Sequence, residues 1–266
     1  MPEPTREHPG LHGIDLTGRA DTAVLLCGGL GTRLRPLTDE LPKALVPVQG
    51  RPLLWHVVQR LVEQGFQRFV LPTGYMGERI RTFAPTLRRE FGVEVHCVET
   101  GVDTTVGARL AAIAPLLPGD DVLLANGDTL FDLDLRQLHR HHRRERALAT
   151  LTSVEIPSRF GLIVERQGEV TDFVRDAAVR RFELAGETAR TGFLNAGFAW
   201  LHPELFDRFA LEQCTNFEVE VYGALARSGE LAHMPLSGFW FCVDTVRDWQ
   251  QANAIELPSA LPTEIV

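Results

Sequence analysis

Residues 24 to 48 read VLLCGGLGTRLRPLTDELPKALVPV, and the rest of the chain can be interpreted outward from them. The first four side chains are apolar or small, which is typical of a short buried strand. Gly28, Gly29 and Gly31 then interrupt the apolar run with residues that adopt positive φ angles at little cost. This stretch therefore predicts a strand that runs straight into a glycine-rich loop.

The loop and the basic residues after it predict a phosphate site. Such a loop lets main-chain N–H groups converge on an anion, and Arg33, Arg35 and Lys43 follow closely. Lys43 is the only lysine among the 27 basic residues of the chain. Because arginine serves every other position, the lone lysine indicates a need for a compact ammonium charge, which a planar guanidinium group cannot replace. We expect a polyphosphate ligand with Lys43 as a main contact.

Two well-known glycine-loop patterns do not fit. The dinucleotide-binding pattern G-x-G-x-x-G requires a third glycine where Leu34 stands. The nucleoside triphosphatase loop requires Gly-Lys followed by Ser or Thr, and the chain has Gly31-Thr32-Arg33. A plain turn with surface arginines stays open as an alternative, although it leaves Pro42-Lys43 unexplained.

The segment GGLGTRLRPLT, followed by PKALVPV, resembles the signature of the sugar nucleotidyltransferases. Enzymes of that family join a nucleoside triphosphate to a sugar 1-phosphate and release pyrophosphate. The resemblance implies that Arg33 neutralises the leaving pyrophosphate and that Lys43 binds phosphate at the reacting end. It also implies triphosphate contacts from the strand end and the loop. These residues are Leu26, Gly28, Gly29, Gly31 and Thr32.

Composition and charge argue against several classes of protein. The 266 residues suffice for one sizeable core, with 44% hydrophobic and 23% charged residues as in ordinary soluble proteins. A net charge of −8 argues against nucleic acid as a partner. The polar start lacks the apolar core of a secretory signal and no later run could cross a membrane, so we expect a cytoplasmic protein without membrane contact. The four cysteines lack a C-x-x-C pair, which predicts buried thiols instead of a zinc site or disulfides.

Alternating patterns of helix and strand predict the fold. Helices are indicated at 51–65, 76–91 and 107–117, and strands at 69–71, 93–98 and 121–126. Strands that alternate with helices over short links form a mostly parallel sheet covered on both faces. We therefore expect an α/β fold with a three-layer, Rossmann-like mixed sheet and a smaller acceptor-binding lobe. Ligands of such sheets bind beyond the carboxyl ends of the strands.

The chain divides into an arm and one domain with two halves. Residues 1–20 are polar and rich in Pro and Gly, which indicates an arm outside the core. Residues 21–258 are expected to form a single nucleotidyltransferase domain, with a nucleotide half at 21–146 and a sugar-phosphate half at 147–258. No internal repeat argues for a second domain. A homo-oligomer stays open.

The run His139-Arg140-His141-His142-Arg143-Arg144 suggests a metal site or a nucleic-acid contact at first sight. It follows Leu135 and Leu138 at helical spacing, so we interpret it as the solvated face of a helix. His56, inside the first predicted helix, is interpreted as a packed side chain and not as a ligand.

Asp128 and Asp244 are the candidate metal ligands. Each follows an apolar run, and two carboxylates at strand ends suit an octahedral Mg²⁺ whose other positions are filled by phosphates and water. The resemblance supports the pair, because the family's metal-binding aspartates lie in motifs that match Asn126-Gly127-Asp128 and Val243-Asp244-Thr245. Alternatively, Asp244 caps the last helix.

Asp132-Leu133-Asp134 supports a different function. A D-x-D motif after a strand binds metal and nucleotide-sugar in many glycosyltransferases. That hypothesis gives the glycine loop no role, and it predicts that a nucleotide-sugar is consumed without pyrophosphate.

Further motifs resemble those of the glucose-1-phosphate cytidylyltransferases. They include Thr100-Gly101-x-x-Thr104-x-x-Gly107-x-Arg109-Leu110 and Gly238-Phe239-Trp240. The resemblance implies nucleotide contacts at Thr100, Gly101, Thr104, Gly107, Arg109 and Gly127. We expect CTP, because a forked donor such as Arg109 can bond to O2 and N3 of cytosine, whereas guanine presents an N–H donor at that edge. A surface position for Arg109, and guanylyl or thymidylyl transfer, are open alternatives.

The acceptor side departs from the cytidylyltransferase pattern. Those enzymes carry a Glu-Lys pair near the sugar phosphate, and this chain has Arg175-Asp176 instead. They also carry an insertion before the Thr-Gly motif that is absent here. The resemblance places Gly161, Asn195 and Gly197 at the same site. The arginine could reach the phosphate while the aspartate accepts hydrogen bonds from sugar hydroxyl groups. A surface loop without a ligand is the alternative, and the acceptor need not be glucose 1-phosphate.

Overall fold

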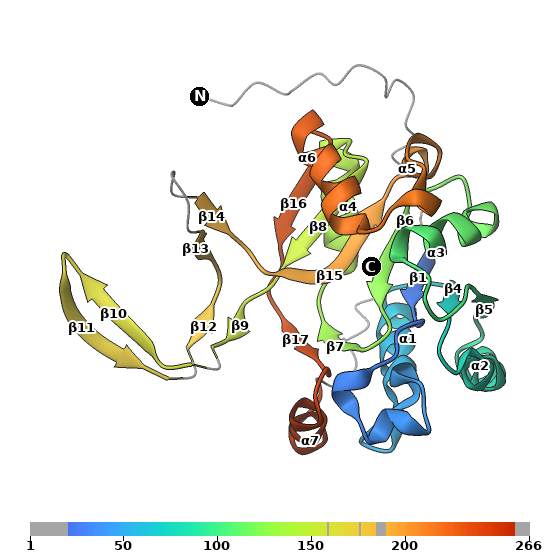
Figure 1. Ribbon diagram of the computed structural model, residues 1–266, viewed down its shortest axis with the longest axis horizontal. Coiled ribbons are helices and arrows are strands. Elements are labelled where there is room, and N and C mark those ends of the chain that lie inside the picture. The colour runs from blue at the N-terminus through green and yellow to red at the C-terminus, as the bar shows by residue number, and fades with distance from the viewer. Residues whose placement is uncertain (1–20, 159, 176, 185–189, 259–266) are drawn as a thin grey trace.

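A seven-stranded sheet forms the centre of the computed structural model, which describes residues 21–158, 160–175, 177–184 and 190–258 (Figure 1). From one edge to the other the strands are β16 (Leu231–Pro235), β8 (Ala149–Ser153), β15 (Asn195–Leu201), β6 (Val122–Asn126), β1 (Thr22–Leu26), β4 (Arg68–Thr73) and β5 (Glu94–Glu99). Neighbouring strands are parallel except at β15, which is antiparallel to β6 and β8. The predicted mixed, mostly parallel sheet is confirmed.

Helices cover both faces of this sheet. One face carries α1 (Leu53–Glu63), α2 (Gly77–Phe91) and α4 (Leu135–Glu145), and the other carries α3 (Val106–Ile113), α5 (Glu204–Arg208) and α6 (Gly223–Ser228). In the central strand β1, Ala23 and Leu25 belong to the first core and Val24 to the second, because successive side chains point to opposite faces. Full burial of one leucine such as Leu25 stabilises the fold by about 1.5–3 kcal/mol.

The glycine-rich segment folds into short turns between β1 and α1. They are the 3-10 helices η1 (Thr32–Leu34), η2 (Leu37–Asp39) and η3 (Lys43–Leu45), followed by the pair β2 (Pro47–Val48) and β3 (Arg51–Pro52). Leu34 and Val46 are fully buried in a third cluster with Leu130, Val243 and Ala252. This cluster joins the glycine-rich segment to the last helix, α7 (Val246–Ala254).

An antiparallel ribbon joins two segments that lie far apart in the sequence. Strand β7 (Thr129–Asp132) pairs with β17 (Phe239–Cys242), and Thr129 stands opposite Cys242. Asp128 precedes β7 and Asp244 closely follows β17. The ribbon therefore brings these two aspartates to one place.

The smaller lobe consists of short strand pairs that extend away from the central sheet (Figure 1). The pairs are β9 (Ile156–Pro157) with β12 (Ala178–Val179), β10 (Leu162–Arg166) with β11 (Glu169–Val174), and β13 (Phe182–Leu184) with β14 (Arg190–Gly192). Strands β8, β15 and β16 belong to the central sheet, so the smaller lobe is only part of the expected sugar-phosphate half. Its role in binding an acceptor stays a prediction.

The histidine run on α4 is a solvated face only in part, because Arg140 and Arg144 are exposed whereas two of its histidines are buried. His139 and His142 are 8% and 1% exposed, and they surround the fully buried Asp121. His139 Nε2 and Arg143 Nη1 each lie 2.9 Å from Asp121 Oδ2, and His142 Nδ1 lies 2.7 Å from the Thr150 hydroxyl oxygen. Burial alone would raise the pKa of Asp121, but the hydrogen bond to His139, together with the nearby His142 and Arg143, holds it well below its usual range. Helical spacing could not predict this burial, because the acidic partner Asp121 comes from the segment directly before β6 (Val122–Asn126).

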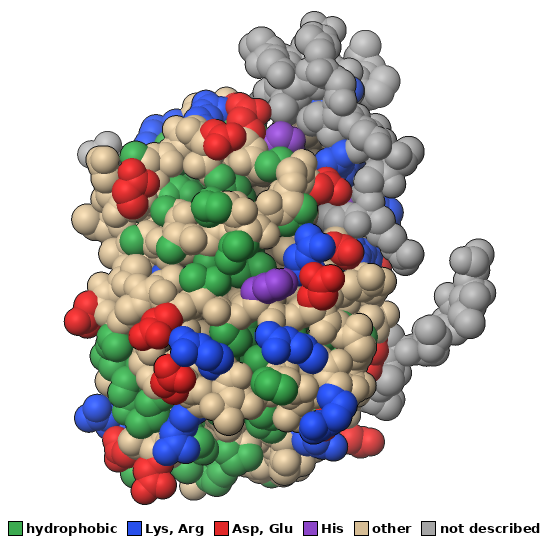
Figure 2. Space-filling model, turned by 90° about the vertical axis from the view of Figure 1, so that its right-hand side faces the viewer, with side chains coloured by type: hydrophobic (Ala, Val, Ile, Leu, Met, Phe, Trp, Pro, Cys, Tyr) green, Lys and Arg blue, Asp and Glu red, His purple; other side chains and the backbone are tan. Residues whose placement is uncertain are grey.

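Other surface features can be stated briefly. No helix in the described part of the chain is long and apolar enough to cross a membrane. Figure 2 shows one face of the molecule, on which basic and acidic side chains are interspersed. His56 is packed as expected, with Nε2 at 2.9 Å from Val48 O. The predicted arm at 1–20 lies outside the described residues.

Candidate active site

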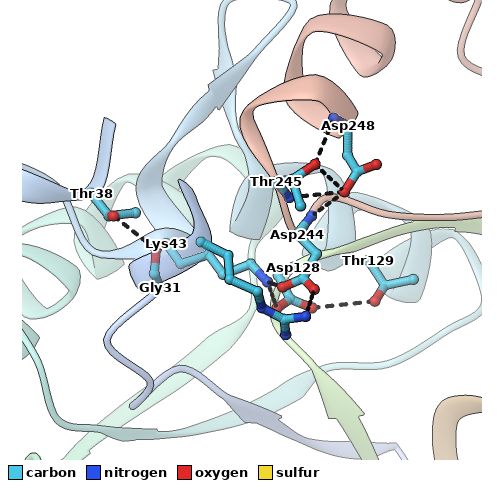
Figure 3. A network of polar contacts seen from close by, with 9 residues as sticks. Gly31, Thr38, Lys43, Asp128, Thr129, Asp244, Thr245 and Asp248 are labelled. Carbon is cyan, nitrogen blue, oxygen red and sulfur yellow. Dashed lines mark hydrogen bonds and ion pairs between the residues drawn. The ribbon is translucent and has the colours of Figure 1, made fainter. Parts of the chain in front are cut away.

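Two carboxylates and one ammonium group meet at one end of the β7–β17 ribbon (Figure 3). Lys43 Nζ lies 2.7 Å from Asp128 Oδ2 and 2.9 Å from Asp244 Oδ1. Asp128 directly precedes β7, Asp244 lies two residues after β17, and the lysine comes from η3. The structure thus brings together three residues that were singled out in the sequence.

The glycine loop positions Lys43. Gly31 has a φ angle of 61°, and the Thr38 hydroxyl group donates to its carbonyl oxygen at 2.9 Å. A Cβ atom on Gly31 would lie 3.1 Å from Cβ of Lys43 and 3.0 Å from Cγ2 of Thr38. The loop therefore packs directly on the lysine, and this position requires glycine.

The lysine is charged in this setting. Burial alone would lower the pKa of Lys43, but the charge of Asp128 and hydrogen bonds to Asp128 and Asp244 raise it above its ordinary value. The side chain of Lys43 is 16% exposed, against 21% and 24% for the aspartates. Partly buried charges are screened by salt less than surface charges, so added salt should weaken this contact less than it weakens a surface ion pair.

Arg33 reaches the same cluster from the solvent side. Its Nη1 lies 2.5 Å from Asp244 Oδ2, and its side chain is 73% exposed. Arg35 pairs instead with Asp39 at 3.2 Å. Two carboxylates are therefore neutralised by two cations, Lys43 and Arg33.

Asp244 does not cap the last helix. Thr245 is the N-cap residue of α7: its hydroxyl oxygen accepts from Asp248 N at 3.2 Å, and Asp248 Oδ2 accepts from Thr245 N at 2.8 Å. Asp248 Oδ2 also accepts from the main-chain N of Asp244 at 3.3 Å. The capping alternative is wrong, and the carboxylate of Asp244 is left for the cluster.

The donor set fits a hard divalent cation when ligand oxygens complete it. Among the described residues no group of three or more His, Cys, Asp or Glu could hold a metal by itself. Two carboxylates at one point suit Mg²⁺ when phosphate and water oxygens fill the other positions. Lys43 Nζ already marks a cation position between these carboxylates. Asp128 and Asp244 would therefore hold a metal together with a bound phosphate ligand.

Arg109 is buried behind the glycine loop. It is 5% exposed, so the alternative of a surface arginine is wrong. Nη2 donates to the carbonyl oxygens of Gly28 and Val102, each at 3.2 Å, and Nη1 donates to Thr73 O at 3.1 Å and to the Thr100 hydroxyl group. Both terminal nitrogens are thus bonded within the protein, and this geometry offers no free fork to a base. Arg109 ties three chain segments together instead.

The other nucleotide candidates lie around this loop. Thr100 donates to Thr73 O from N at 2.9 Å and from Oγ1 at 2.8 Å, and its carbonyl oxygen accepts from the Thr104 hydroxyl group. Gly101 has a φ angle of 95°. A Cβ atom on Gly29 would meet no heavy atom within 4 Å, so the loop has open space at this residue.

Two of the candidate glycines have structural explanations. A Cβ atom on Gly107 would lie 2.4 Å from Leu211 O, so this glycine lets α3 approach the 211–214 segment. A Cβ atom on Gly127 would lie 2.8 Å from Cys27 Sγ. Both positions need glycine for packing, whether or not a nucleotide is near. Thr32 begins η1 and is exposed.

A pocket of about 110 Å³ lies at the carboxyl ends of β1 and β6. Its lining includes Leu26, Asn126, Asn195, Gly197, Glu218 and Tyr222. Asn195 Nδ2 donates to Glu218 Oε1 at 3.3 Å, and a Cβ atom on Gly197 would lie 2.7 Å from Asn126 Nδ2. Sequence reasoning missed Glu218 and Tyr222 because η6 (Glu218–Tyr222) carries no motif. It is a π-helical turn, a feature that is frequent at functional sites.

The remaining acceptor candidates lie on the smaller lobe. A Cβ atom on Gly161 would lie 2.2 Å from Cζ of Phe173, so this glycine accommodates the ring. Arg175 directly follows β11 and is exposed, and Asp176 lies outside the described residues. Among the described residues no hydrogen bond or ion pair joins Gly161 or Arg175 to the Lys43 cluster.

The D-x-D hypothesis finds no metal site. Asp132 ends β7, whereas Asp134 caps α4 by accepting a hydrogen bond from Gln137 N at 2.7 Å. Asp134 also pairs with Arg140 at 3.4 Å. One of the two aspartates on which the glycosyltransferase hypothesis depends is therefore a helix cap.

Comparisons with known proteins identify the family and support the fold. The family model described as nucleotidyl transferase matches residues 22–256. Glucose-1-phosphate cytidylyltransferase of Salmonella typhimurium is 32% identical over 260 residues, covering 87% of this chain and 97% of that protein. Mannose-1-phosphate guanylyltransferase catalytic subunit beta of Xenopus tropicalis is 28% identical over 242 residues, covering 89% and 65%. The crystal structure of apo UDP-glucose pyrophosphorylase has the same fold, with a TM-score of 0.66 at 16% identity, covering 89% of this chain and 97% of that chain.

Proposed function

The chain belongs to the nucleotidyl transferase family, and on that premise we propose that it makes an NDP-sugar. It transfers a nucleotidyl group from a nucleoside triphosphate to a sugar 1-phosphate and releases pyrophosphate. The observation that carries this proposal is the meeting of Lys43 with Asp128 and Asp244 beside the glycine loop. Charges of both signs at one point suit a triphosphate together with its metal.

The reaction requires positioning and charge neutralisation, without a protein nucleophile. An oxygen of the sugar phosphate attacks the α-phosphorus in line, and the bond from this phosphorus to the leaving pyrophosphate breaks. Lys43 neutralises charge at the reacting phosphate, and Arg33 does so on the leaving group. Asp128 and Asp244 would hold Mg²⁺, which would supply further positive charge to the phosphate oxygens.

CTP is the nucleotide that we propose. The support is the motif from Thr100 to Arg109 and the similarity to the Salmonella cytidylyltransferase. Because Arg109 is bonded within the protein, its role is to hold the main chain of Gly28 and Val102 around the nucleotide. The guanylyltransferase relative makes GTP the second candidate.

The acceptor is proposed to bind between the smaller lobe and the pocket that Asn195 and Glu218 line. The amide and carboxylate groups of the pocket can hydrogen-bond to sugar hydroxyl groups. Arg175 is exposed and forms no ion pair with another described residue, so it is available for the acceptor phosphate. The Arg175-Asp176 pair leaves the choice of sugar open.

A substrate panel tests this proposal. CTP, GTP and dTTP are each combined with several sugar 1-phosphates and Mg²⁺, and pyrophosphate release is measured. We expect release that requires the sugar phosphate and is fastest with CTP. Absence of release with every pair would contradict the proposal, and faster turnover with GTP would change the base.

A further inference from the structure

The expected phosphate-binding cations and the expected metal ligands are bonded to each other in this structure. Lys43 Nζ bridges Asp128 Oδ2 and Asp244 Oδ1 at 2.7 and 2.9 Å. Arg33 Nη1 contacts the other oxygen of Asp244 at 2.5 Å. The other oxygen of Asp128 lies 3.3 Å from the Thr129 hydroxyl group. Every carboxylate oxygen of the pair therefore already has a partner.

An ammonium group and a divalent cation cannot share this position. Mg²⁺ requires carboxylate oxygens at about 2.0–2.1 Å, closer than the contacts that Nζ makes. A metal bound to both aspartates would occupy the space of Nζ, and the like charges would repel each other. The side chain of Lys43 therefore has to turn away before both carboxylates can bind a metal. It is 16% exposed, so it lies partly at the surface.

We infer that Lys43 is an exchangeable counter-ion that keeps free divalent metal out of the site until a nucleotide binds. The inference rests on the proposed function, because the phosphates supply the new partner for the ammonium group. When a metal–nucleotide complex enters, Asp128 and Asp244 exchange the two cations for the metal. Lys43 and Arg33 then contact phosphate oxygens instead of the carboxylates. No charge is then left partly buried without a partner, whereas metal alone would strand the ammonium group.

This exchange predicts that metal affinity without nucleotide is low and rises when the ammonium group is removed. Without Lys43 the two aspartates face each other with Arg33 as their only described cation. Their mutual repulsion then favours a divalent cation. We expect a gain in affinity of at least ~10-fold, which corresponds to about 1.4 kcal/mol.

Titration with Mn²⁺ in place of Mg²⁺ tests the inference without nucleotide, since free Mn²⁺ is read by electron paramagnetic resonance. Lys43→Met removes the charge and keeps an unbranched side chain. Arg140→Met is the matched control, because Arg140 is exposed and pairs with Asp134 on and beside α4. Lys43→Met should bind Mn²⁺ at least ~10-fold more tightly than the wild type, and Arg140→Met should bind it like the wild type.

A further variant shows whether the gain depends on the carboxylates. Adding Asp128→Asn to Lys43→Met should abolish the increase. If Lys43→Met does not fold, as judged by circular dichroism, Lys43→Gln replaces it. A folded variant that binds Mn²⁺ as weakly as the wild type, or a gain that survives Asp128→Asn, would overturn the inference. No turnover is measured, so failure of this exchange and failure of the substrate panel are distinct results.

Discussion

Arg109→Met should destabilise the protein by about 2–4 kcal/mol and lower its activity with every nucleotide. The substitution removes the guanidinium group and keeps an unbranched apolar side chain. The lost hydrogen bonds join the glycine loop, the end of β4 and the loop after β5, at Gly28, Thr73, Thr100 and Val102. These segments would then be held less firmly around the nucleotide.

The size of the effect follows from the burial of each bond. The bonds to Gly28 O and Thr73 O are buried, and a hydrogen bond from a charged donor contributes about 1.5–3 kcal/mol. Thr73 O keeps two bonds from Thr100, and the bond to Val102 O is partly exposed, so water can replace it. Relief from burying the guanidinium charge offsets part of the sum, which leaves about 2–4 kcal/mol.

Equilibrium unfolding in urea measures this loss, with Arg140→Met as the exposed control that should stay within about 0.5 kcal/mol of the wild type. The values of kcat/KM for CTP, GTP and dTTP should fall together in Arg109→Met. A variant as stable as the wild type, with only its nucleotide preference changed, would refute the positioning role. Arg109 would then read the base directly.

The remaining predictions concern the metal ligands, the acceptor and the effect of pH. Asp128→Asn and Asp244→Asn should each raise the Mg²⁺ concentration that gives half-maximal rate. The double variant should need little more Mg²⁺ than either single variant, since the effects of groups that act as a unit are not additive. A double variant whose increase is the product of the two single increases would indicate separate roles. Arg175→Ala should raise the KM for the sugar phosphate more than that for the nucleotide. Arg181 is another exposed arginine of the smaller lobe, directly before β13, and the same shift in Arg181→Ala instead would move the phosphate contact there. Burial lowers the pKa of His142 below its ordinary 6.5, so the unfolded chain binds the proton more readily and the free energy of unfolding should fall as the pH drops from about 7 to 5. His142→Gln should flatten this dependence in urea unfolding at each pH, and an unchanged slope would show that another group causes it.

Local patterns in the sequence predicted most of the fold. The helices expected at 51–65 and 76–91 are observed at Leu53–Glu63 and Gly77–Phe91, because apolar spacing, proline and glycine mark a helix within its own residues. Strand β7 was not predicted. It is short, and its partner β17 lies more than a hundred residues later, so no local signal announces the pairing.

The Lys43 cluster could be anticipated from the sequence only in part. The sequence identifies the three residues, because the lysine is unique and both aspartates follow apolar runs. The distances between them depend on the β7–β17 ribbon, which has no local signal in the sequence. The burial of Arg109 and His142 depends on partners from other elements, at Thr73 and Asp121. Periodicity reports which face of a helix is apolar, and it cannot report a buried polar partner that arrives from elsewhere.

An isotope measurement tests nucleotidyl transfer most directly. A sugar 1-phosphate with ¹⁸O in the bridge between C1 and phosphorus is turned over with CTP and Mg²⁺, and the products are weighed by mass spectrometry. Nucleotidyl transfer predicts that all of the label stays in the NDP-sugar and that pyrophosphate is unlabelled, because a phosphate oxygen attacks and the C1–O bond remains intact. An NDP-sugar without the label, or label in a released phosphate product, would mean that the C1–O bond breaks, and nucleotidyl transfer would be contradicted.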